Sequence, residues 1–288
     1  MSGNGSHDGA AAASGSDLQP ARIRALLPPD AFGRPYVFRA TASSTNDEAR
    51  TLAAAGAPEG AVVVADAQTA GRGRLGHVWH SPPGVSLHVS LVLRPRGPPA
   101  RLSGLTLVVA VAVAEAVERF LPGPVSLRWP NDLFLGGKKA AGVLTELDAE
   151  GAIVRHVIVG VGVNVNLDES ALPPELRGQA TSLRAARGGE PVDRAALLVE
   201  LLARLRHRWE ELLARGAGPA LAAWRARAPM LGGTVDVWAV AASETTAPDF
   251  SGVAEDVEED GALRVRLADG STRRVVAGEV RERAPARA

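Results

Sequence analysis

The sequence predicts an α+β protein: a mixed, largely antiparallel sheet with flanking helices, followed by a small C-terminal β-barrel. Three observations predict this fold class. Apolar, β-branched segments between residues 125 and 166 follow one another with only short turns between them, which favours antiparallel pairing. A continuous apolar run before them predicts a buried helix, and a long stretch after them has apolar residues at helical spacing. After residue 231 the chain becomes a run of short strands separated by Gly/Asp turns, which is typical of a small barrel.

The first 35 residues are expected to form a disordered or poorly structured tail. Residues 1–20 are rich in Gly, Ala and Ser and contain no Lys or Arg, so they lack the basic start and apolar core of a secretory signal. The most apolar run, residues 104–117, is short for a membrane span and contains Glu115. It predicts a buried core helix, and we expect a cytoplasmic protein without a membrane partner.

Residues 36–230 are expected to form one large domain, and residues 231–283 the barrel. In chain order we expect a helix over 43–56 with Ser44 and Asp47 at capping-box spacing, strands over 61–65 and 84–95, an apolar helix over 104–117 capped by Ser103, strands over 125–129, 132–135, 138–147 and 152–166, a long helix capped by Asp193, and a short helix near 218–228. The domain boundary is placed near Leu231, where the pattern changes from helical to alternating.

The composition excludes several kinds of chemistry. The chain has no cysteine, which rules out disulfides, thiolate metal sites and thiol nucleophiles. Its 32 basic residues balance its 32 acidic residues, so no global attraction to nucleic acid is expected. Only two of the basic residues are lysines, the adjacent Lys138 and Lys139. Because a compact ammonium cannot be mimicked by the planar guanidinium of arginine, the pair suggests a functional lysine; a chance pair at a hairpin is the alternative.

The stretch "GRGRLG" at residues 71–76 has the spacing of a dinucleotide-binding loop. Its context argues against NAD, because the Pro-Pro-Gly at 82–84 prevents the helix that should follow, and the first carboxylate after Asp66 is Glu115. An anion-binding loop is still compatible with the pattern, since two arginines on a Gly-rich turn suit a phosphate or a carboxylate. A solvated turn is the other interpretation of this stretch.

Four segments carry a family resemblance: "SSTN" (43–46), "QTAGRGRLGHVW" (68–79), "RWPNDLFLGGKKAAG" (128–142) and "GVGVNVN" (160–166). Together they resemble the catalytic core of biotin protein ligases, over roughly residues 36–230, and the barrel resembles the SH3-like tail domain of that family. Members that also repress transcription carry an N-terminal helix-turn-helix. About 35 Gly/Ala/Ser-rich residues precede the core here, so the short form without DNA binding is expected.

The resemblance implies an enzyme that makes biotinyl-5′-AMP from biotin and ATP and then transfers biotin to a lysine of a biotin carboxyl carrier protein domain. ATP and Mg²⁺ are implied as co-substrate and activator, with no tightly bound prosthetic group. The implied partner is the carrier domain of a biotin-dependent carboxylase, and a homodimer is compatible with the family. The alternatives are a lipoate or octanoate ligase on the same general fold and a non-enzymatic biotin-sensing regulator.

Residue roles follow from the matching motif positions. On the biotin side the resemblance places Ser44, Thr45, Asn46, Gln68, Gly71, Arg72, Gly73, Arg74, Lys139 and Gly142; on the ATP and adenylate side it places Arg74, Trp79, Asn131, Asp132 and Asn164, with Asp132 also a candidate Mg²⁺ ligand. Lys139 and Arg74 are the implied catalytic residues, and Lys138 is regarded as incidental. Plain structural roles compete with these: a helix cap for Ser44, a core side chain for Trp79 and a turn for residues 130–132.

The loop at residues 66–83 is expected to be mobile without ligand and ordered around biotinyl-AMP. It is rich in Gly and clusters its arginines without a nearby carboxylate in the sequence. His77 stands where some family members carry Arg or Lys, so loop closure is expected to differ in this chain.

Overall fold

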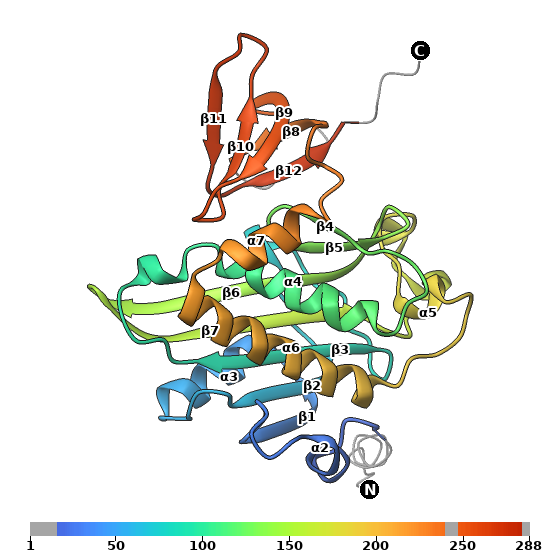
Figure 1. Ribbon diagram of the computed structural model, residues 1–288. Coiled ribbons are helices and arrows are strands. Elements are labelled where there is room, and N and C mark those ends of the chain that lie inside the picture. Colours follow the sequence, from blue (N-terminus) through green and yellow to red (C-terminus); the bar gives the residue numbers. More distant parts are fainter. Residues whose placement is uncertain (1–15, 240–246, 284–288) are drawn as a thin grey trace, which may run out of the picture.

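The computed structural model describes residues 16–239 and 247–283, which form two parts (Figure 1). The larger part is a seven-stranded sheet with helices on both faces. The smaller part is a five-stranded antiparallel sheet near the C-terminus. This arrangement confirms the predicted α+β class with a largely antiparallel main sheet.

The main sheet has the strand order β1-β2-β3-β7-β6-β5-β4. Its strands are β1 (Tyr36–Ala42), β2 (Val62–Gln68), β3 (Ser86–Leu93), β4 (Ser126–Arg128), β5 (Asp132–Leu135), β6 (Lys138–Glu150) and β7 (Ile153–Asn164). Only β1 and β2 pair in parallel, and the neighbours from β2 to β4 are all antiparallel. Short turns connect β4 through β7, as their spacing in the sequence predicts.

The helices divide between the two faces of this sheet. They are α2 (Pro20–Leu26), α3 (Thr45–Ala54), α4 (Leu105–Glu118), α5 (Leu183–Ala186), α6 (Arg194–Arg215) and α7 (Gly218–Arg225), with single 3-10 turns at Arg74–Gly76, Pro99–Leu102, Glu169–Ala171 and Pro174–Leu176. α4 packs on the sheet beneath α6 and α7, and α3 packs against β2, β3 and β7. Because α3 lies on the other face, its N-terminus is free to border a cavity there.

The apolar helix α4 is buried, as its composition predicts. The stretch Pro99–Glu118 is long and apolar enough to cross a membrane by length and composition, yet almost all of α4 lies in the core between the sheet and α6. The predicted cap is wrong. Gly104, with φ +76°, occupies the N-cap position and Ser103 ends the preceding 3-10 turn, because only a residue tolerant of left-handed backbone makes that junction.

The prediction of an unstructured tail is wrong for residues 16–35. Helix α2 packs on α6, and both Leu18 and Ile23 are completely buried. The phenolic oxygen of Tyr36 donates to the Leu18 carbonyl over 2.8 Å. Asp17 pairs with the buried Arg194 at 2.5 Å. Composition misled here because the few apolar residues of this segment have partners that are distant in sequence. The rest of the predicted tail, residues 1–15, lies outside the described residues.

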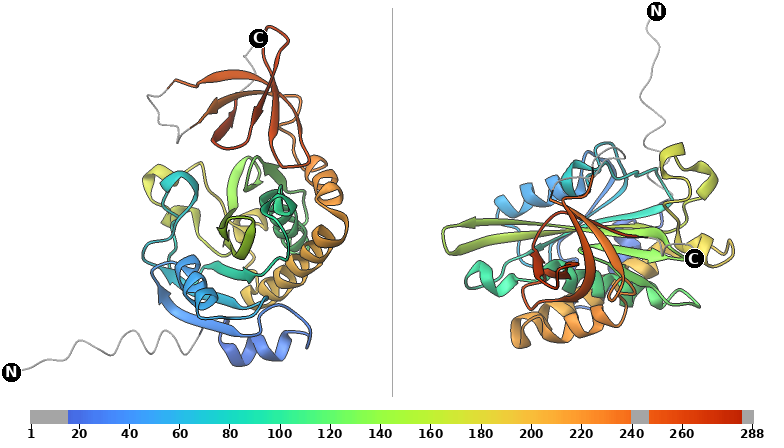
Figure 2. Two further views of the ribbon diagram at one scale, coloured as in Figure 1. Left: turned by 90° about the vertical axis from the view of Figure 1, so that its left-hand side faces the viewer. Right: turned by 90° about the horizontal axis from the view of Figure 1, so that it is seen from above.

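The second sheet has the order β11-β10-β9-β8-β12 and lies beyond α7 and β4 (Figures 1 and 2). Its strands are β8 (Thr234–Trp238), β9 (Phe250–Val257), β10 (Leu263–Arg266), β11 (Thr272–Val275) and β12 (Glu279–Glu282). The indole nitrogen of Trp129 donates to the Gly261 carbonyl at 2.9 Å, and Arg225 pairs with Asp256 at 2.6 Å. These contacts bring β12 to the edge of a cavity in the first part.

Candidate active site

A cavity of about 650 Å³ opens on the α3 face of the main sheet. It is bordered by the start of α3, the loop after β2, the β5–β6 hairpin, β7, the segment 176–180 and β12. The sequence-predicted residues that line it are Ser44, Thr45, Asn46, Gln68, Arg72, Gly73, Arg74, Trp79, Asn131, Asp132, Lys139, Gly142 and Asn164. Residues from four separate sequence segments therefore meet in one place. Gly71 lies just behind them.

Glycines form the floor of the cavity under Trp79. Gly142 and Gly162 are direct partners across β6 and β7. A β-carbon at Gly162 would lie 2.6 Å from the indole of Trp79, and one at Gly142 would lie 3.1 Å from it. Gly71 allows a similar approach, since a β-carbon there would lie 2.7 Å from the Trp79 carbonyl oxygen. Trp79 is thus a wall of the cavity and not an ordinary core side chain.

Gly160 and Gly162 are two further glycines of the site, for which no role was predicted. Their spacing of two residues in "GVGVNVN" puts both on one face of β7, which is the signal that could have found them. A β-carbon at Gly160 would lie 2.2 Å from Oδ1 of Asn46. Glycine at this position therefore makes room for the Asn46 side chain.

A chain of hydrogen bonds organises the end of the cavity near α3. The backbone N–H and the hydroxyl of Thr45 both donate to Oε1 of Gln68, at 2.9 and 3.1 Å. The Gln68 amide donates to the Ser81 hydroxyl at 3.1 Å, and that hydroxyl donates to the Trp79 carbonyl. Ser90 lies within 2.8 Å of the Thr45 hydroxyl. This end of the cavity can thus hold a small polar head group in one orientation.

The predicted capping box of α3 is wrong. Ser44 occupies the N-cap position, but its side chain makes no capping hydrogen bond. Asp47 instead accepts hydrogen bonds from both terminal guanidinium nitrogens of Arg72, at 2.7 and 2.9 Å, and from Arg50 at 2.7 Å. The hydrogen bond from Arg72 holds the pKa of Asp47 below its ordinary value. The Ser44 hydroxyl is left facing the cavity.

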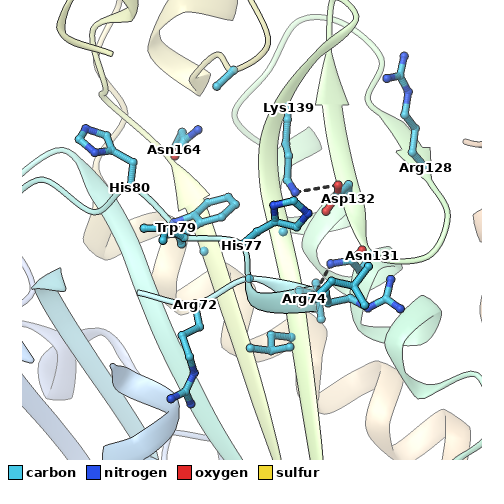
Figure 3. A pocket seen from close by; sticks show the side chains of 18 of the residues that line it. Arg72, Arg74, His77, Trp79, His80, Arg128, Asn131, Asp132, Lys139 and Asn164 are labelled. Atoms are coloured by element: carbon cyan, nitrogen blue, oxygen red, sulfur yellow. Dashed lines mark hydrogen bonds and ion pairs between the residues drawn. The ribbon is translucent and has the colours of Figure 1, made fainter. Parts of the chain in front are cut away.

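The two arginines of the loop have different surroundings (Figure 3). Arg72 forms a two-pronged ion pair with Asp47 and lies 3.7 Å from Glu146. Arg74 makes no side-chain hydrogen bond or ion pair within residues 16–239 and 247–283. Burial lowers the pKa of Arg74, and the charge of Asp132 opposes this. The expectation that neither arginine has a carboxylate nearby is wrong for Arg72, because Asp47 approaches from another element.

Lys139 and Asp132 lie together on the β5–β6 side of the cavity. The Lys139 ammonium is 2.7 Å from Oδ2 of Asp132 and 5.6 Å from the centre of the Trp79 ring. The Lys139 backbone pairs with the chain at Gln179 and Thr181, at 2.8 and 2.9 Å, which fixes the start of β6. These contacts direct a cation toward the space between Trp79 and Asp132.

Lys138 points to a different part of the structure. It pairs with Glu169 at 2.8 Å, and this hydrogen bond lowers the pKa of the Glu169 carboxyl. The two adjacent lysines alternate along a strand, so only one of them can face the cavity. Lys138 has the incidental position that was expected.

The two predicted asparagines support the backbone around the cavity. The Asn131 amide donates to the Val143 carbonyl at 2.8 Å, which ties the turn before β5 to β6. The Asn164 amide donates to the Thr181 carbonyl at 3.0 Å. Both side chains still line the cavity. A structural role was an alternative to the ligand role in the sequence, and these hydrogen bonds show that both side chains hold the walls.

The C-terminal sheet contributes a wall that no sequence motif predicts. Residues 278–282 line the cavity. His77 of the loop lies 3.5 Å from Glu279, and Arg128 lies 2.5 Å from Glu282 and stacks on Phe134. The site therefore belongs to both parts of the chain. No local sequence signal marks this contact, because β12 is about 200 residues away from the loop.

The described residues contain no cluster of three or more His, Asp or Glu side chains that could hold a metal ion by themselves. Asp132 still fits a shared ion, because its Oδ1 is buried and has no partner among the described residues. Mg²⁺ commonly binds through one or two carboxylates together with substrate phosphates. An ion that arrives with a nucleotide therefore suits this site better than a resident one.

The chain is similar to several known proteins. Residues 37–164 match the biotin/lipoate A/B protein ligase family, and residues 244–281 match the biotin protein ligase C terminal domain. The bifunctional ligase/repressor BirA of Bacillus subtilis is 37% identical over 88% of this chain and 76% of its own length. The biotin--[acetyl-CoA-carboxylase] ligase of Paracoccus denitrificans is 35% identical over 79% of this chain and 92% of its own.

Among solved structures, the biotin protein ligase from Aquifex aeolicus in complex with biotin and ATP superposes with a TM-score of 0.71. It is 29% identical to this chain, and the match covers 86% of this chain and 98% of the other.

Proposed function

This chain belongs to the biotin protein ligase family, and we propose that the cavity beside Lys139 is the place where it activates biotin with ATP. The chain is an ATP-dependent ligase that forms biotinyl-5′-AMP and passes biotin to a carrier protein of a biotin-dependent carboxylase. The position of Lys139 carries the assignment of the site. Its ammonium lies beside Trp79 and Asp132, on the β5–β6 side of the cavity.

The first step joins two anions. A carboxylate oxygen of biotin attacks the α-phosphorus of ATP, the bond from that phosphorus to the β-phosphate oxygen breaks, and pyrophosphate leaves. The protein needs no nucleophile of its own; it must hold the anions together and stabilise the charge that develops. We assign this work to Lys139 and Arg74, because Arg74 is the loop arginine that no described carboxylate pairs with.

The biotin head is assigned to the end of the cavity near α3. A ureido group has two N–H donors and one carbonyl acceptor, so its site must offer both acceptors and donors. The Ser44 hydroxyl, which makes no capping bond, can donate to the carbonyl. Thr45, Asn46 and Gln68 complete the polar end, while Gly71, Gly73 and Gly142 let the loop and β6 come close. Arg72 acts by holding the loop to α3.

The nucleotide is assigned to the β5–β6 end. Trp79 offers a flat face to the adenylate, and Asn131 and Asn164 fix the walls around it. The Mg²⁺ that accompanies ATP neutralises phosphate charge when bound, and Asp132, with its unpartnered Oδ1, is the residue that would hold it.

In the second step the amine of the carrier lysine attacks the acyl carbonyl of biotinyl-AMP and AMP leaves. The loop with Arg74 and the wall from β12 both border the cavity, so they are placed to keep water from the reactive anhydride until the carrier arrives.

The test follows the two steps separately. Biotin-dependent exchange of pyrophosphate into ATP measures adenylate formation, and the mass gain of a carrier domain measures transfer. Lipoate and octanoate serve as matched acids. Exchange with either of them, and none with biotin, would favour the lipoate-ligase alternative. Biotin binding without any exchange would favour a sensor.

Three further parts of the proposal concern the setting of the reaction. We place the enzyme in the cytoplasm because it consumes ATP, and cell fractionation tests this location. We also propose that ligation proceeds without nucleic acid, since basic and acidic residues balance, and that the chain can form a homodimer. Sedimentation with and without biotinyl-AMP and a DNA duplex tests both.

A further inference from the structure

We propose that Glu146 is a positioning residue of this active site: it fixes the side-chain amide of Asn46 so that the Asn46 oxygen is presented to biotin. The inference rests on the proposed function and names a residue that none of the sequence motifs contains. Glu146 lies on β6, two residues beyond Leu144, which lines the cavity. Its neighbour Thr145 bonds to Thr106 of α4 on the opposite face, so Glu146 projects toward α3.

The two oxygens of Glu146 have separate partners. Oε2 accepts a hydrogen bond from the Asn46 amide at 2.6 Å. Oε1 accepts one from Arg50 at 2.8 Å, and Arg72 lies 3.7 Å from the same oxygen. Arg50 is in turn anchored by Asp47, one turn earlier on α3. Arg50 therefore holds the Glu146 carboxylate through Oε1, and Oε2 is a fixed acceptor for the Asn46 amide.

A carboxylate accepts hydrogen bonds and donates none, so only one orientation of the Asn46 amide is compatible with it. The NH₂ group must face Glu146, and the oxygen must face the other way. That oxygen accepts a hydrogen bond from the Ser90 hydroxyl at 2.6 Å and lies over Gly160 in the cavity floor. One of its two lone pairs remains for a ligand.

This orientation matters for a ureido ligand. Its N–H groups need acceptors, and a rotated amide would present NH₂ to N–H, which loses one hydrogen bond and sets two donors against each other. Asn46 is almost fully buried, so solvent cannot compensate for the mismatch. Without Glu146, the buried amide would have no described acceptor for its NH₂ group in this orientation.

The test measures biotin affinity by calorimetry, without ATP, for Glu146→Leu and Glu146→Gln. We expect the Leu variant to weaken biotin binding about tenfold, the equivalent of one buried charged hydrogen bond. The Gln variant keeps an oxygen that can accept from Asn46, so a smaller loss is expected. The KM for ATP should change less than about twofold in both. Asp148→Asn is the control, because it changes another carboxylate of the same strand, which lies 3.4 Å from His156 and does not line the cavity.

A double-mutant cycle separates positioning from general damage. In an Asn46→Ala background, Glu146→Leu should cause no further loss of biotin affinity, because the group that it positions is gone. Full additivity of the two losses, or wild-type affinity in a folded Glu146→Leu protein, would overturn the proposal. Failure of the proposed function is distinguishable, since it would be an absence of biotin-dependent pyrophosphate exchange in the unaltered protein.

Discussion

The indole of Trp79 lies so close to Gly162 that a β-carbon there would come within 2.6 Å of the ring. Gly162 is a strand residue without positive φ, so alanine suits its backbone. We therefore expect Gly162→Ala to act through the displaced indole, at an overpacking cost of about 1–3 kcal/mol. The KM for ATP should rise more than the KM for biotin. Gly123→Ala is the matched control, because an added β-carbon there meets open space and its φ is not positive. Gly151→Ala would also meet open space, but the φ of Gly151 is positive. Unchanged ATP kinetics in Gly162→Ala would contradict the role of Trp79.

Lys139→Ala is expected to reduce adenylate formation about 100-fold or more while changing biotin affinity little. The ammonium stabilises charge that develops when carboxylate and phosphate meet, so its loss affects the transition state most. Lys139→Arg should also be poor, because its bulkier fork must fit between Asp132 and Trp79. Pyrophosphate exchange and calorimetry measure the two effects. Near-normal turnover of Lys139→Arg would show that the retained lysine is not essential, and Lys138→Arg provides the control.

Arg74→Gly is expected to let biotinyl-AMP escape, so that lysines on bystander proteins become labelled. Arg74 has no described partner to hold it without an anion, and the adenylate would provide charge-assisted hydrogen bonds. Incubation with ATP, biotin and an unrelated lysine-rich protein measures the labelling. If adenylate is still made and bystander labelling stays at the wild-type level, Arg74 does not retain the intermediate.

Arg72→Ala should act differently, because it releases the loop from α3 in the free enzyme. A half-exposed bidentate ion pair contributes on the order of 1 kcal/mol, so proteolysis of the 66–83 loop should speed up several-fold without ligand. The contact of Arg72 with Asp47 predicts less mobility of this loop than the sequence suggests. If the loop is cleaved at the same rate in Arg72→Ala and in the wild type, Arg72 does not hold the loop to α3 in the free enzyme.

Deletion of residues 1–30 is expected to destabilise the protein. It removes the fully buried Leu18 and Ile23 and leaves the buried Arg194 without Asp17. The free energy of unfolding should fall by about 3 kcal/mol or more. Deletion of residues 1–15, which contain no motif, should leave stability and activity unchanged. Denaturant unfolding compares the two truncations, and similar stability for both would show that the α2 contacts contribute little.

His88 predicts a loss of stability in acid. Burial, then the charge of Arg194, lowers the pKa of His88 from 6.5 to about 3. Below pH 6.5 the His88 imidazole therefore binds a proton in the unfolded chain, whereas in the folded chain it stays neutral until the pH is near 3. His88 has no effect above pH 6.5, and as the pH falls toward 3 it shifts the folding equilibrium toward unfolding by about tenfold per pH unit. Compared with the wild type, His88→Phe should lose less stability between pH 6.5 and 4.5. Parallel stability curves for the two proteins would refute this.

Several properties of this protein are readable from its sequence. Apolar residues at helical spacing predicted α6, which buries one face. Apolar or β-branched segments predicted α4 and the strands β3 to β7, and α4 and β3 are buried on nearly every side. The motif segments, grouped by the family resemblance, contributed side chains that line one cavity. Asp193 caps α6 as predicted, through bonds to Ala195 and Ala196.

Tertiary structure decided what each of these residues contacts. Arg72 and Arg74 look equivalent in the sequence. Only the approach of Asp47 from α3 gives Arg72 an ion pair that holds the loop, and it leaves Arg74 available for an anion. The sequence also does not predict that β12 forms a wall of the cavity or that α2 packs on α6. The physical reason is common to all three: local patterns determine which face of an element is buried, whereas an ion pair depends on two elements that meet only after the chain has folded.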